Sequence, residues 1–185
     1  MAALINALYT GNGITQQIKQ AFSASEPRVV QLHDFLAPAV YKALIAAAKK
    51  TKSTQVCIAD RFCHGVAPVP TVFRKYFSSK EFVAFVKAAT GVTIKGQPML
   101  LRFGHRCYTL RCDDHERDPL VVSLDLTAAW DEKWGGSLIV AGEESRVIPV
   151  AQNSLTLADG KKAYPFVQYV NHYAKKQERL FLLVR

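Results

Sequence analysis

The stretch that decides the fold covers residues 103–138 and reads FGHRCYTLRCDDHERDPLVVSLDLTAAWDEKWGGSL. It combines a polar cluster, an apolar run with the character of a buried strand, a tryptophan and a two-glycine turn: Cys112 to Glu116, Leu120 to Leu126, Trp130 and Gly135-Gly136. Cysteine, aspartate, histidine and glutamate side chains supply the lone pairs that metal ions bind. The cluster is therefore a candidate metal site beside a buried strand.

Strands are expected on both sides of this stretch. From residue 93 onward, short apolar segments alternate with turn signals such as Ala141-Gly142 and Asp159-Gly160. Many short strands joined by polar turns are typical of a β-sandwich or barrel. The predicted strands are Pro98–Arg102, Arg106–Leu110, Leu120–Leu126, Ser137–Val140, Arg146–Pro149, Ser154–Leu157, Phe166–Val170 and Arg179–Val184.

Helices are expected before these strands. Pro38 suits the first turn of a helix, and apolar residues then recur at helical spacing as far as Ala48. Ser78-Ser79-Lys80-Glu81 is similar to a capping box that opens a second helix, and Gly91 ends it. Residues 51–77 contain two prolines and show no clear element. Helices followed by a run of strands predict the α+β class.

A single domain is expected over residues 28–185, preceded by a loosely packed N-terminal arm at residues 1–27. Gly11-Asn12-Gly13 breaks this arm, and Ile14 to Phe22 is expected to form a short helix. The chain has 185 residues, of which 49% are hydrophobic, which suits one domain with a sizeable core. No apolar run approaches the roughly 20 residues that span a bilayer, so no membrane partner is expected.

Charge and cysteine content set expectations about partners and location. The net charge of +9 favours an acidic partner, although a merely basic surface is preferred because no Lys/Arg run exceeds two residues. Four cysteines are too few to suggest a disulfide framework in a chain of this length, so free buried thiols and a cytoplasmic location are expected.

The order of motifs resembles the 2-oxoglutarate- and iron(II)-dependent oxygenases, in particular their prolyl-4-hydroxylase-like branch. The resemblance covers about residues 28 to 185 and depends on the order of several weak motifs. These are Asp34-Phe35-Leu36-Ala37-Pro38, Phe103-Gly104, Cys112-Asp113-Asp114, Leu124-Asp125-Leu126, Trp130, Gly135-Gly136-Ser137-Leu138, Asn153 to Leu157, and Val167 with Val170. The resemblance implies a double-stranded β-helix, or jelly roll, supported by N-terminal helices.

The same resemblance implies an iron site that this sequence does not reproduce. The family binds iron(II) through two histidines and one carboxylate. Of these positions, only Asp114 matches; Cys112 replaces the first histidine, and Pro165 stands where the distal histidine is expected. A rearranged site would use Asp114 with His115 and His172, and Cys112 is a further candidate ligand.

The resemblance also implies a site for the co-substrate 2-oxoglutarate. Arg179 stands where the family has the arginine that binds a 2-oxoglutarate carboxylate, and Tyr108 is a candidate to hydrogen-bond it. The alternative without a functional role is that Arg179 is a surface arginine on an edge strand and that Tyr108 lines the core.

The residues alone suggest other candidate sites, for zinc, for catalysis and for nucleic acid. Two groups offer zinc ligands: Cys57 with Cys63 and His64, and His105 with Cys107 and Cys112. The spacing of Cys57 and Cys63 is too wide and that of Cys107 and Cys112 just fits, but free cysteines are preferred because cysteine packs well as a small hydrophobe. A Cys/His nucleophile based on Cys112 or Cys63, and an acid/base pair among Asp113, Asp114 and Glu116, stay open. Nucleic-acid binding through Arg74 to Phe77 or Tyr164 to Lys176 is possible but less favoured.

Two functions are therefore carried forward. The first is an oxygenase-like protein that has lost the conventional iron site and uses its barrel cleft for binding or for metal-independent chemistry. The second is an active 2-oxoglutarate-dependent hydroxylase with atypical iron ligands. In either case the expected partner is a small molecule or a protein substrate, anionic ones included.

Overall fold

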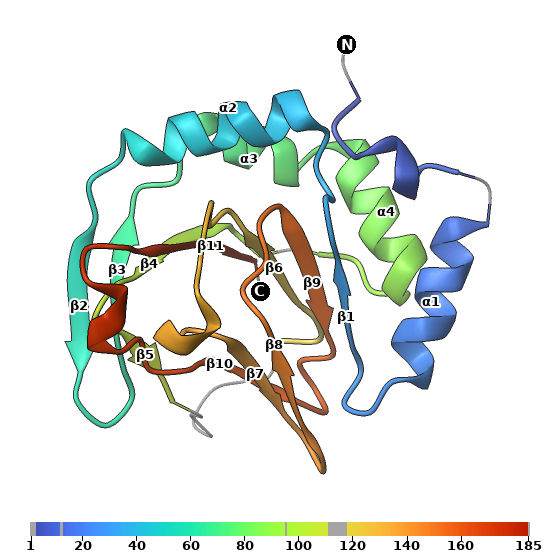
Figure 1. The fold of residues 1–185 in the computed structure, drawn as a ribbon. Coiled ribbons are helices and arrows are strands. Elements are labelled where there is room, and N and C mark those ends of the chain that lie inside the picture. Colours follow the sequence, from blue (N-terminus) through green and yellow to red (C-terminus); the bar gives the residue numbers. More distant parts are fainter. Residues whose placement is uncertain (1–2, 12, 95, 111–117, 185) are drawn as a thin grey trace.

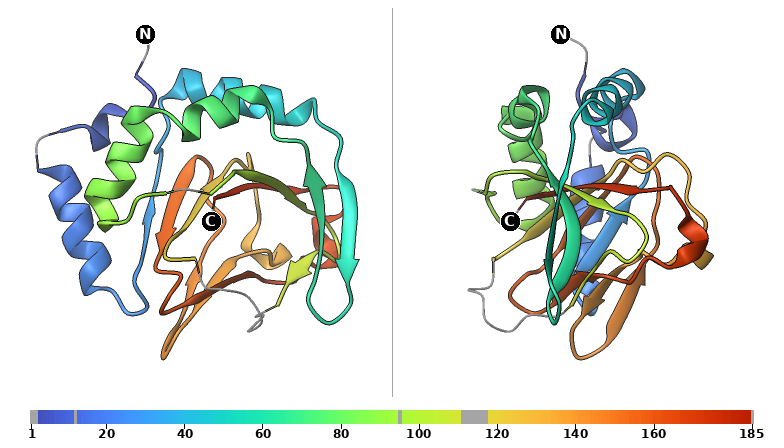
Figure 2. Two further views of the ribbon diagram at one scale, coloured as in Figure 1. Left: turned by 180° about the vertical axis from the view of Figure 1, so that it is seen from behind. Right: turned by 90° about the vertical axis from the view of Figure 1, so that its left-hand side faces the viewer.

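The computed structural model describes residues 3–11, 13–94, 96–110 and 118–184. Two antiparallel sheets face each other, and helices cover the outer face of the larger sheet (Figures 1 and 2). The larger sheet has the order β1-β9-β6-β11-β4-β3-β2, with β5 paired to β3, and the smaller has the order β10-β7-β8. The strands are β1 (Val29–Leu32), β2 (Thr54–Ile58), β3 (Phe62–Ala67), β4 (Met99–Phe103), β5 (Tyr108–Thr109), β6 (Val121–Asp125), β7 (Leu138–Ala141), β8 (Ser145–Ile148), β9 (Ser154–Ala158), β10 (Tyr164–Val167) and β11 (Arg179–Val184).

The helices precede most of the strands, in agreement with the predicted α+β class. They are α1 (Ile14–Ala24), α2 (Pro38–Lys49), α3 (Thr71–Phe77) and α4 (Lys80–Thr90), with short 3-10 helices η1 (Ala7–Tyr9), η2 (Glu132–Trp134) and η3 (His172–Ala174). None of the helices in the described part of the chain is long and apolar enough to cross a membrane.

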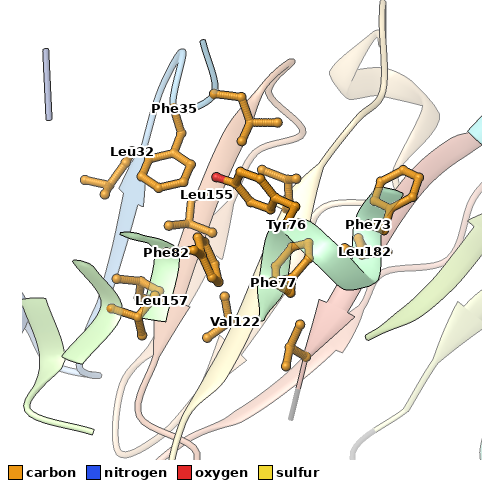
Figure 3. Packing of buried hydrophobic residues seen from close by; sticks show 14 of the residues in the cluster. Leu32, Phe35, Phe73, Tyr76, Phe77, Phe82, Val122, Leu155, Leu157 and Leu182 are labelled. Carbon is orange, nitrogen blue, oxygen red and sulfur yellow. The ribbon is translucent and has the colours of Figure 1, made fainter. Parts of the chain in front are cut away.

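Alternation along the central strands produces two separate cores. On β11, Leu180 and Leu182 join a cluster between the larger sheet and the helices, while Phe181 and Leu183 join a second cluster between the two sheets. Successive strand residues point to opposite faces, so a strand covered on both sides is apolar throughout. Figure 3 shows the first cluster, in which Phe73 and other aromatic residues from the helices lie over the leucines of the sheet.

Each of the eight strands predicted after residue 93 has a counterpart between β4 and β11. Two of them differ from the prediction by more than one residue at an end. The predicted strand Arg106–Leu110 is reduced to the two residues of β5, because a turn with Arg106 at φ 70° precedes it. The strand predicted at Phe166–Val170 begins and ends earlier, as β10, and Val170 instead makes an isolated bridge with Gly135.

Residues 51–77, which showed no clear element in the sequence, contain β2, β3 and α3. All five residues of β2 are exposed, and this strand is the edge of the larger sheet. Without a buried face, a strand has no apolar alternation to reveal it. The prolines that argued against structure lie between elements: Pro68 follows β3, and Pro70 is the N-cap of α3.

The N-terminal segment is packed more closely than expected. Ile5, Ile18 and Phe22 are buried in the cluster between helices and sheet, and α1 packs against α4. The prediction of loose packing is therefore wrong for these residues, although α1 itself begins at Ile14 as expected.

The capping of α4 differs in detail from the predicted capping box. Ser79, not Ser78, is the N-cap, and its hydroxyl accepts a hydrogen bond from the Phe82 N–H at 3.2 Å. The Glu81 carboxylate accepts a hydrogen bond from the Ile5 N–H at 3.2 Å, so this side chain holds the N-terminal segment on α4. Gly91 ends the helix at φ 79°, as predicted.

The cysteines are not all free. Cys57 and Cys63 are cross-strand partners on β2 and β3 and form a disulfide, which corrects the prediction of free thiols and removes both from the first zinc group. Cys107 is free and buried, as expected. Among the described residues, no group of three or more His, Cys, Asp and Glu side chains is arranged to hold a metal ion.

Candidate functional site

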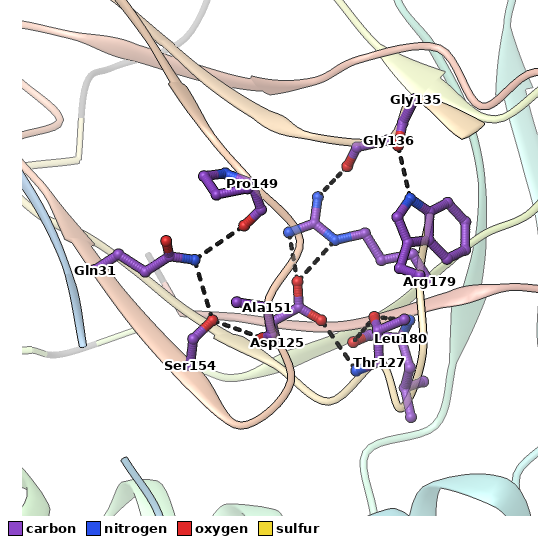
Figure 4. Close-up of polar contacts among 11 residues, drawn as sticks. Gln31, Asp125, Thr127, Gly135, Gly136, Pro149, Ala151, Ser154, Arg179 and Leu180 are labelled. Carbon is purple, nitrogen blue, oxygen red and sulfur yellow. Dashed lines mark hydrogen bonds and ion pairs between the residues drawn. The ribbon is translucent and has the colours of Figure 1, made fainter. Parts of the chain in front are cut away.

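An ion pair lies in the space between the two sheets. Asp125 ends β6, and Arg179 begins the neighbouring strand β11, where it is two residues from Phe181, the cross-strand partner of Asp125. Both side chains therefore point to the same face of the sheet. Asp125 Oδ2 accepts hydrogen bonds from Arg179 Nε at 3.0 Å and from Nη2 at 2.8 Å (Figure 4). With exposures of 3% and 2%, both groups are withdrawn from solvent.

The guanidinium of Arg179 has two further contacts. Its Nη1 donates a hydrogen bond to the Gly136 carbonyl oxygen, and its Cζ lies 4.6 Å from the centre of the Phe181 ring. A planar guanidinium can donate in its plane and stack on an aromatic ring at the same time. Arg179 is thus buried at the centre of the larger sheet, and its interpretation as a surface arginine on an edge strand is wrong.

The second carboxylate oxygen of Asp125 is also bonded. Asp125 Oδ1 accepts a hydrogen bond from the Thr127 N–H at 3.0 Å, and the Thr127 hydroxyl accepts one from the Leu180 N–H at 3.1 Å (Figure 4). These contacts join the ends of β6 and β11, so the carboxylate is fixed from both sides. A fully bonded buried network of this kind holds one geometry.

The two-glycine turn supplies the carbonyl for Arg179 and requires glycine. Gly135 and Gly136 both have φ 76°, a left-handed value that favours glycine. A Cβ on Gly135 would meet the Tyr169 carbonyl oxygen at 2.1 Å. Trp130 Nε1 donates a hydrogen bond to the Gly135 carbonyl oxygen at 2.8 Å, so the tryptophan of the opening motif fixes the turn that contacts Arg179.

Further polar side chains lie along the same face of the larger sheet. Ser123 and Thr156 are buried cross-strand partners, and Ser154 is the partner of Asp125. Gln31 Nε2 donates to the Ser154 hydroxyl at 3.2 Å and to the Pro149 carbonyl oxygen at 3.0 Å (Figure 4). This row of polar residues in the barrel interior is the feature of the site that the sequence motifs did not single out.

The other predicted site residues are dispersed. The Tyr108 hydroxyl donates to the Ala59 carbonyl oxygen at 2.5 Å, in the loop between β2 and β3. His172 is exposed on η3, with its ring 4.1 Å from that of Tyr173. Pro165 lies on β10 opposite Val140. Cys112, Asp114 and His115, with the rest of the predicted acid/base group, lie outside the described residues.

The positions of Arg179, Pro165 and His172 can be compared with the 2-oxoglutarate and iron sites that the sequence resemblance implied. A 2-oxoglutarate carboxylate requires a cationic partner, but the charge of Arg179 is already balanced by Asp125. The Pro165 side chain has no atom that binds iron. The described residues therefore do not fit the co-substrate in its conventional place, and they supply His172 alone of the predicted iron ligands.

One sequence signal could have revealed the Asp125–Arg179 pair. Asp125 interrupts an apolar strand, and charged groups are almost never fully buried unless they are paired. This rule calls for a cationic partner, but it does not say which of the 24 Lys and Arg residues is the partner. The register of β6 with β11 decides that.

This chain resembles known proteins in its structure but not detectably in its sequence. No protein-family model matches the sequence, and no curated protein matches it by sequence. A prolyl-4-hydroxylase from Pseudomonas putida has a TM-score of 0.72 at 13% identity, over 93% of this chain and 98% of that chain. A prolyl hydroxylase from Trichoplax adhaerens, in complex with a hypoxia inducible factor peptide fragment, has a TM-score of 0.71 at 14% identity, over 96% and 90% of the two chains.

A 2OG-Fe(II) oxygenase family oxidoreductase from Burkholderia pseudomallei is similar to the same extent, with a TM-score of 0.69 at 15% identity, over 94% of this chain and 91% of that chain. The helices, the two facing sheets and these neighbours agree with the fold predicted from the order of motifs. The chain has the double-stranded β-helix fold of the 2-oxoglutarate- and iron(II)-dependent oxygenases, in the form found in prolyl-4-hydroxylases.

Proposed function

We propose that this protein is an oxygenase-like binding protein that has lost the conventional iron site and uses the barrel cleft to bind a ligand or for metal-independent chemistry. The observation that carries the proposal is the Asp125–Arg179 ion pair. In the conventional arrangement the arginine is available to the co-substrate, whereas here a carboxylate of the protein occupies it.

The energetic cost of displacing Asp125 supports this proposal. A 2-oxoglutarate carboxylate that took Arg179 would leave Asp125 buried, charged and without its cation. Removing one partner of a buried ion pair costs about 3–5 kcal/mol. Since about 1.4 kcal/mol corresponds to a tenfold change in affinity, binding through Arg179 is expected to weaken by a factor of roughly 100 or more.

The ligand class follows from charge and from the neighbours. A chain with a net charge of +9 attracts anionic ligands, and one structural neighbour was solved with a peptide fragment. We therefore propose a small anionic molecule or a protein segment as the ligand. The polar row of Gln31, Ser154 and Thr156 offers hydrogen-bonding groups on the interior face of the sheet.

The decisive experiment is anaerobic titration of the purified protein with iron(II) and 2-oxoglutarate. We expect neither stoichiometric iron nor the weak visible charge-transfer band that the iron–2-oxoglutarate complex produces. Stoichiometric iron together with that band would contradict the proposal and support the active hydroxylase with atypical ligands. In that case Asp114→Ala should abolish iron binding, because Asp114 matches the carboxylate position of the motif.

A matched pair of variants tests the role of the ion pair directly. Asp125→Asn keeps the shape of the side chain and an acceptor for Thr127 but releases the charge of Arg179. Calorimetry should therefore detect 2-oxoglutarate binding more readily in Asp125→Asn than in the wild type, and the double variant with Arg179→Met should lose the gain. Equal binding by all three proteins would show that Arg179 is not the anchor.

A further inference from the structure

Three of the four cysteines meet at one edge of the larger sheet. Cys57 and Cys63 face each other across β2 and β3 and are joined as a disulfide. Cys107 lies in the turn before β5, immediately before Tyr108, which is the cross-strand partner of Cys63. A thiol and a disulfide that are distant in sequence are thereby brought together.

The contacts of the Gln55 side chain limit how far apart the sulfur atoms of the three cysteines can be. Gln55 Nε2 lies 3.1 Å from Cys63 Sγ, 3.5 Å from Cys107 Sγ and 3.8 Å from Cys57 Sγ. Because the sulfur atoms of Cys63 and Cys107 both lie within 3.5 Å of one nitrogen atom, they cannot be farther apart than twice that distance. Gln55 is exposed, so its amide can withdraw from between them.

A polar cavity gives this cluster access to solvent. It has a volume of about 250 Å³, and Gln55 and Cys107 line it together with Lys175 and Lys176. Cys57 is itself exposed on the edge strand, while Cys107 is buried apart from this cavity wall. The two outer cysteines therefore differ in accessibility, and Cys63 lies between them in the cross-strand order.

We propose that Cys57, Cys63 and Cys107 form a thiol–disulfide exchange site. The Cys107 thiolate attacks Cys63 Sγ, the new Cys63–Cys107 bond forms as the Cys57–Cys63 bond breaks, and the proton lost by Cys107 is taken up by the departing Cys57 thiolate. The reaction conserves the number of thiols and disulfides, so it needs no external oxidant. Exchange proceeds through attack of a thiolate on a disulfide sulfur, as at other protein disulfides.

The exchange changes which elements are covalently joined. The Cys57–Cys63 bond lies within one hairpin, whereas a Cys63–Cys107 bond ties that hairpin to the turn beside the barrel. The backbone of this turn is bonded to Val170, since Arg106 N–H donates to the Val170 carbonyl and Val170 N–H donates to the Cys107 carbonyl, each at 2.9 Å. Val170 belongs to the core between the sheets, so a change of disulfide partner at Cys107 is positioned to affect the packing of that core.

Peptide mapping tests the proposal, because trypsin separates all four cysteines. Cleavage after Lys and Arg places Cys57, Cys63, Cys107 and Cys112 on the peptides 53–61, 62–74, 107–111 and 112–117. Cys57→Ser, oxidised mildly with oxidised glutathione and quenched with acid and an alkylating agent, should yield peptides 62–74 and 107–111 joined by a disulfide. Cys107→Ser is the matched control and should keep the 53–61 to 62–74 link.

Wild-type protein in glutathione buffers of graded potential provides the second measurement. The link between 62–74 and 107–111 should appear as a minor species alongside the link between 53–61 and 62–74. The proposal is overturned if Cys57→Ser leaves Cys63 and Cys107 alkylated, or linked to glutathione or to a second chain, and the wild type never shows the exchanged link. This readout does not involve 2-oxoglutarate or iron, so it is independent of the proposed function.

Discussion

Asp125 and Arg179 are 54 residues apart in the chain, yet their side chains form a buried ion pair with 2.8 Å between Asp125 Oδ2 and Arg179 Nη2. The pair joins the ends of two neighbouring strands, β6 and β11, and Arg179 is the residue that the sequence resemblance placed at the co-substrate position. In the proposed function, this pair determines what the barrel can bind.

Removal of one member of this pair should destabilise the protein strongly. Asp125→Ala leaves a buried guanidinium without its counter-charge, and the free energy of unfolding should fall by about 3–5 kcal/mol. The double variant Asp125→Ala with Arg179→Met removes both charges and should recover part of the loss. Urea unfolding followed by fluorescence measures both values; a loss below 1 kcal/mol, the scale of exposed pairs, would contradict the buried pairing.

Asn153 should be hard to replace, because its side chain satisfies the backbone of Leu36 in the core. Its Oδ1 accepts from the Leu36 N–H and its Nδ2 donates to the Leu36 carbonyl, each at 3.0 Å, and its φ of 52° is one that asparagine tolerates. Asn153→Ala leaves two buried groups without partners, each costing about 1–3 kcal/mol. Asn153→Gly adopts the same φ without strain and also removes both side-chain hydrogen bonds, so in the same urea titration it separates their loss from the backbone strain of alanine.

Gly135→Ala should destabilise the protein more than Gly91→Ala. The two residues have nearly the same φ, 76° and 79°, but ψ is −148° at Gly135 and −2° at Gly91, so alanine is under more backbone strain at Gly135. A Cβ at Gly91 meets nothing within 4 Å, whereas at Gly135 it meets the Tyr169 carbonyl oxygen at 2.1 Å. The difference between the melting temperatures of the two variants measures the combined cost of this strain and the clash. Equal melting temperatures would mean that the Gly135 turn relaxes without cost.

Stability should decline as the pH rises above about 10, the ordinary pKa of tyrosine. Burial raises the pKa of Tyr41 to about 12; a hydrogen bond with the Gln152 side chain lowers this pKa, and the charges of Asp125 and Asp34 raise it by smaller amounts. Burial also raises the pKa of Tyr76, and the charge of Glu81 raises it further. These phenols are harder to ionise in the folded state. Their contribution to stability is therefore complete below pH 10 and is lost as the pH rises through the raised values.

Urea unfolding at pH 8, 9, 10 and 11 measures this dependence. Tyr41→Phe removes one of the titrating groups and should flatten the decline between pH 10 and 11. Lys19→Met, at an exposed position on α1, serves as a control for general changes in charge at high pH. If the free energy of unfolding of Tyr41→Phe declines with pH as steeply as that of the wild type, Tyr41 is excluded as a cause of the decline.

Much of the fold was predictable because it depends on local patterns. Apolar alternation and turn residues located the strands from β4 to β11, and Pro38, Ser79 and Gly91 marked the ends of two helices to within a residue. The exposed strand β2 escaped prediction, since an edge strand without a buried face carries no such pattern. The buried contacts of Ile5 and Phe22 were also missed, because burial of a terminal segment depends on what it packs against.

The sequence by itself determined the order of the strands from β4 to β11, the family likeness of the fold and the chemistry that each side chain can offer, such as the absence of a metal-binding side-chain atom at Pro165. The tertiary structure alone decided which distant residues meet. Arg179 is paired with Asp125 because β6 and β11 are neighbours in a particular register, and Cys57, Cys63 and Cys107 converge because β3 pairs with both β2 and β5. Strand register is set by packing over the whole sheet, so no local stretch of sequence encodes these contacts.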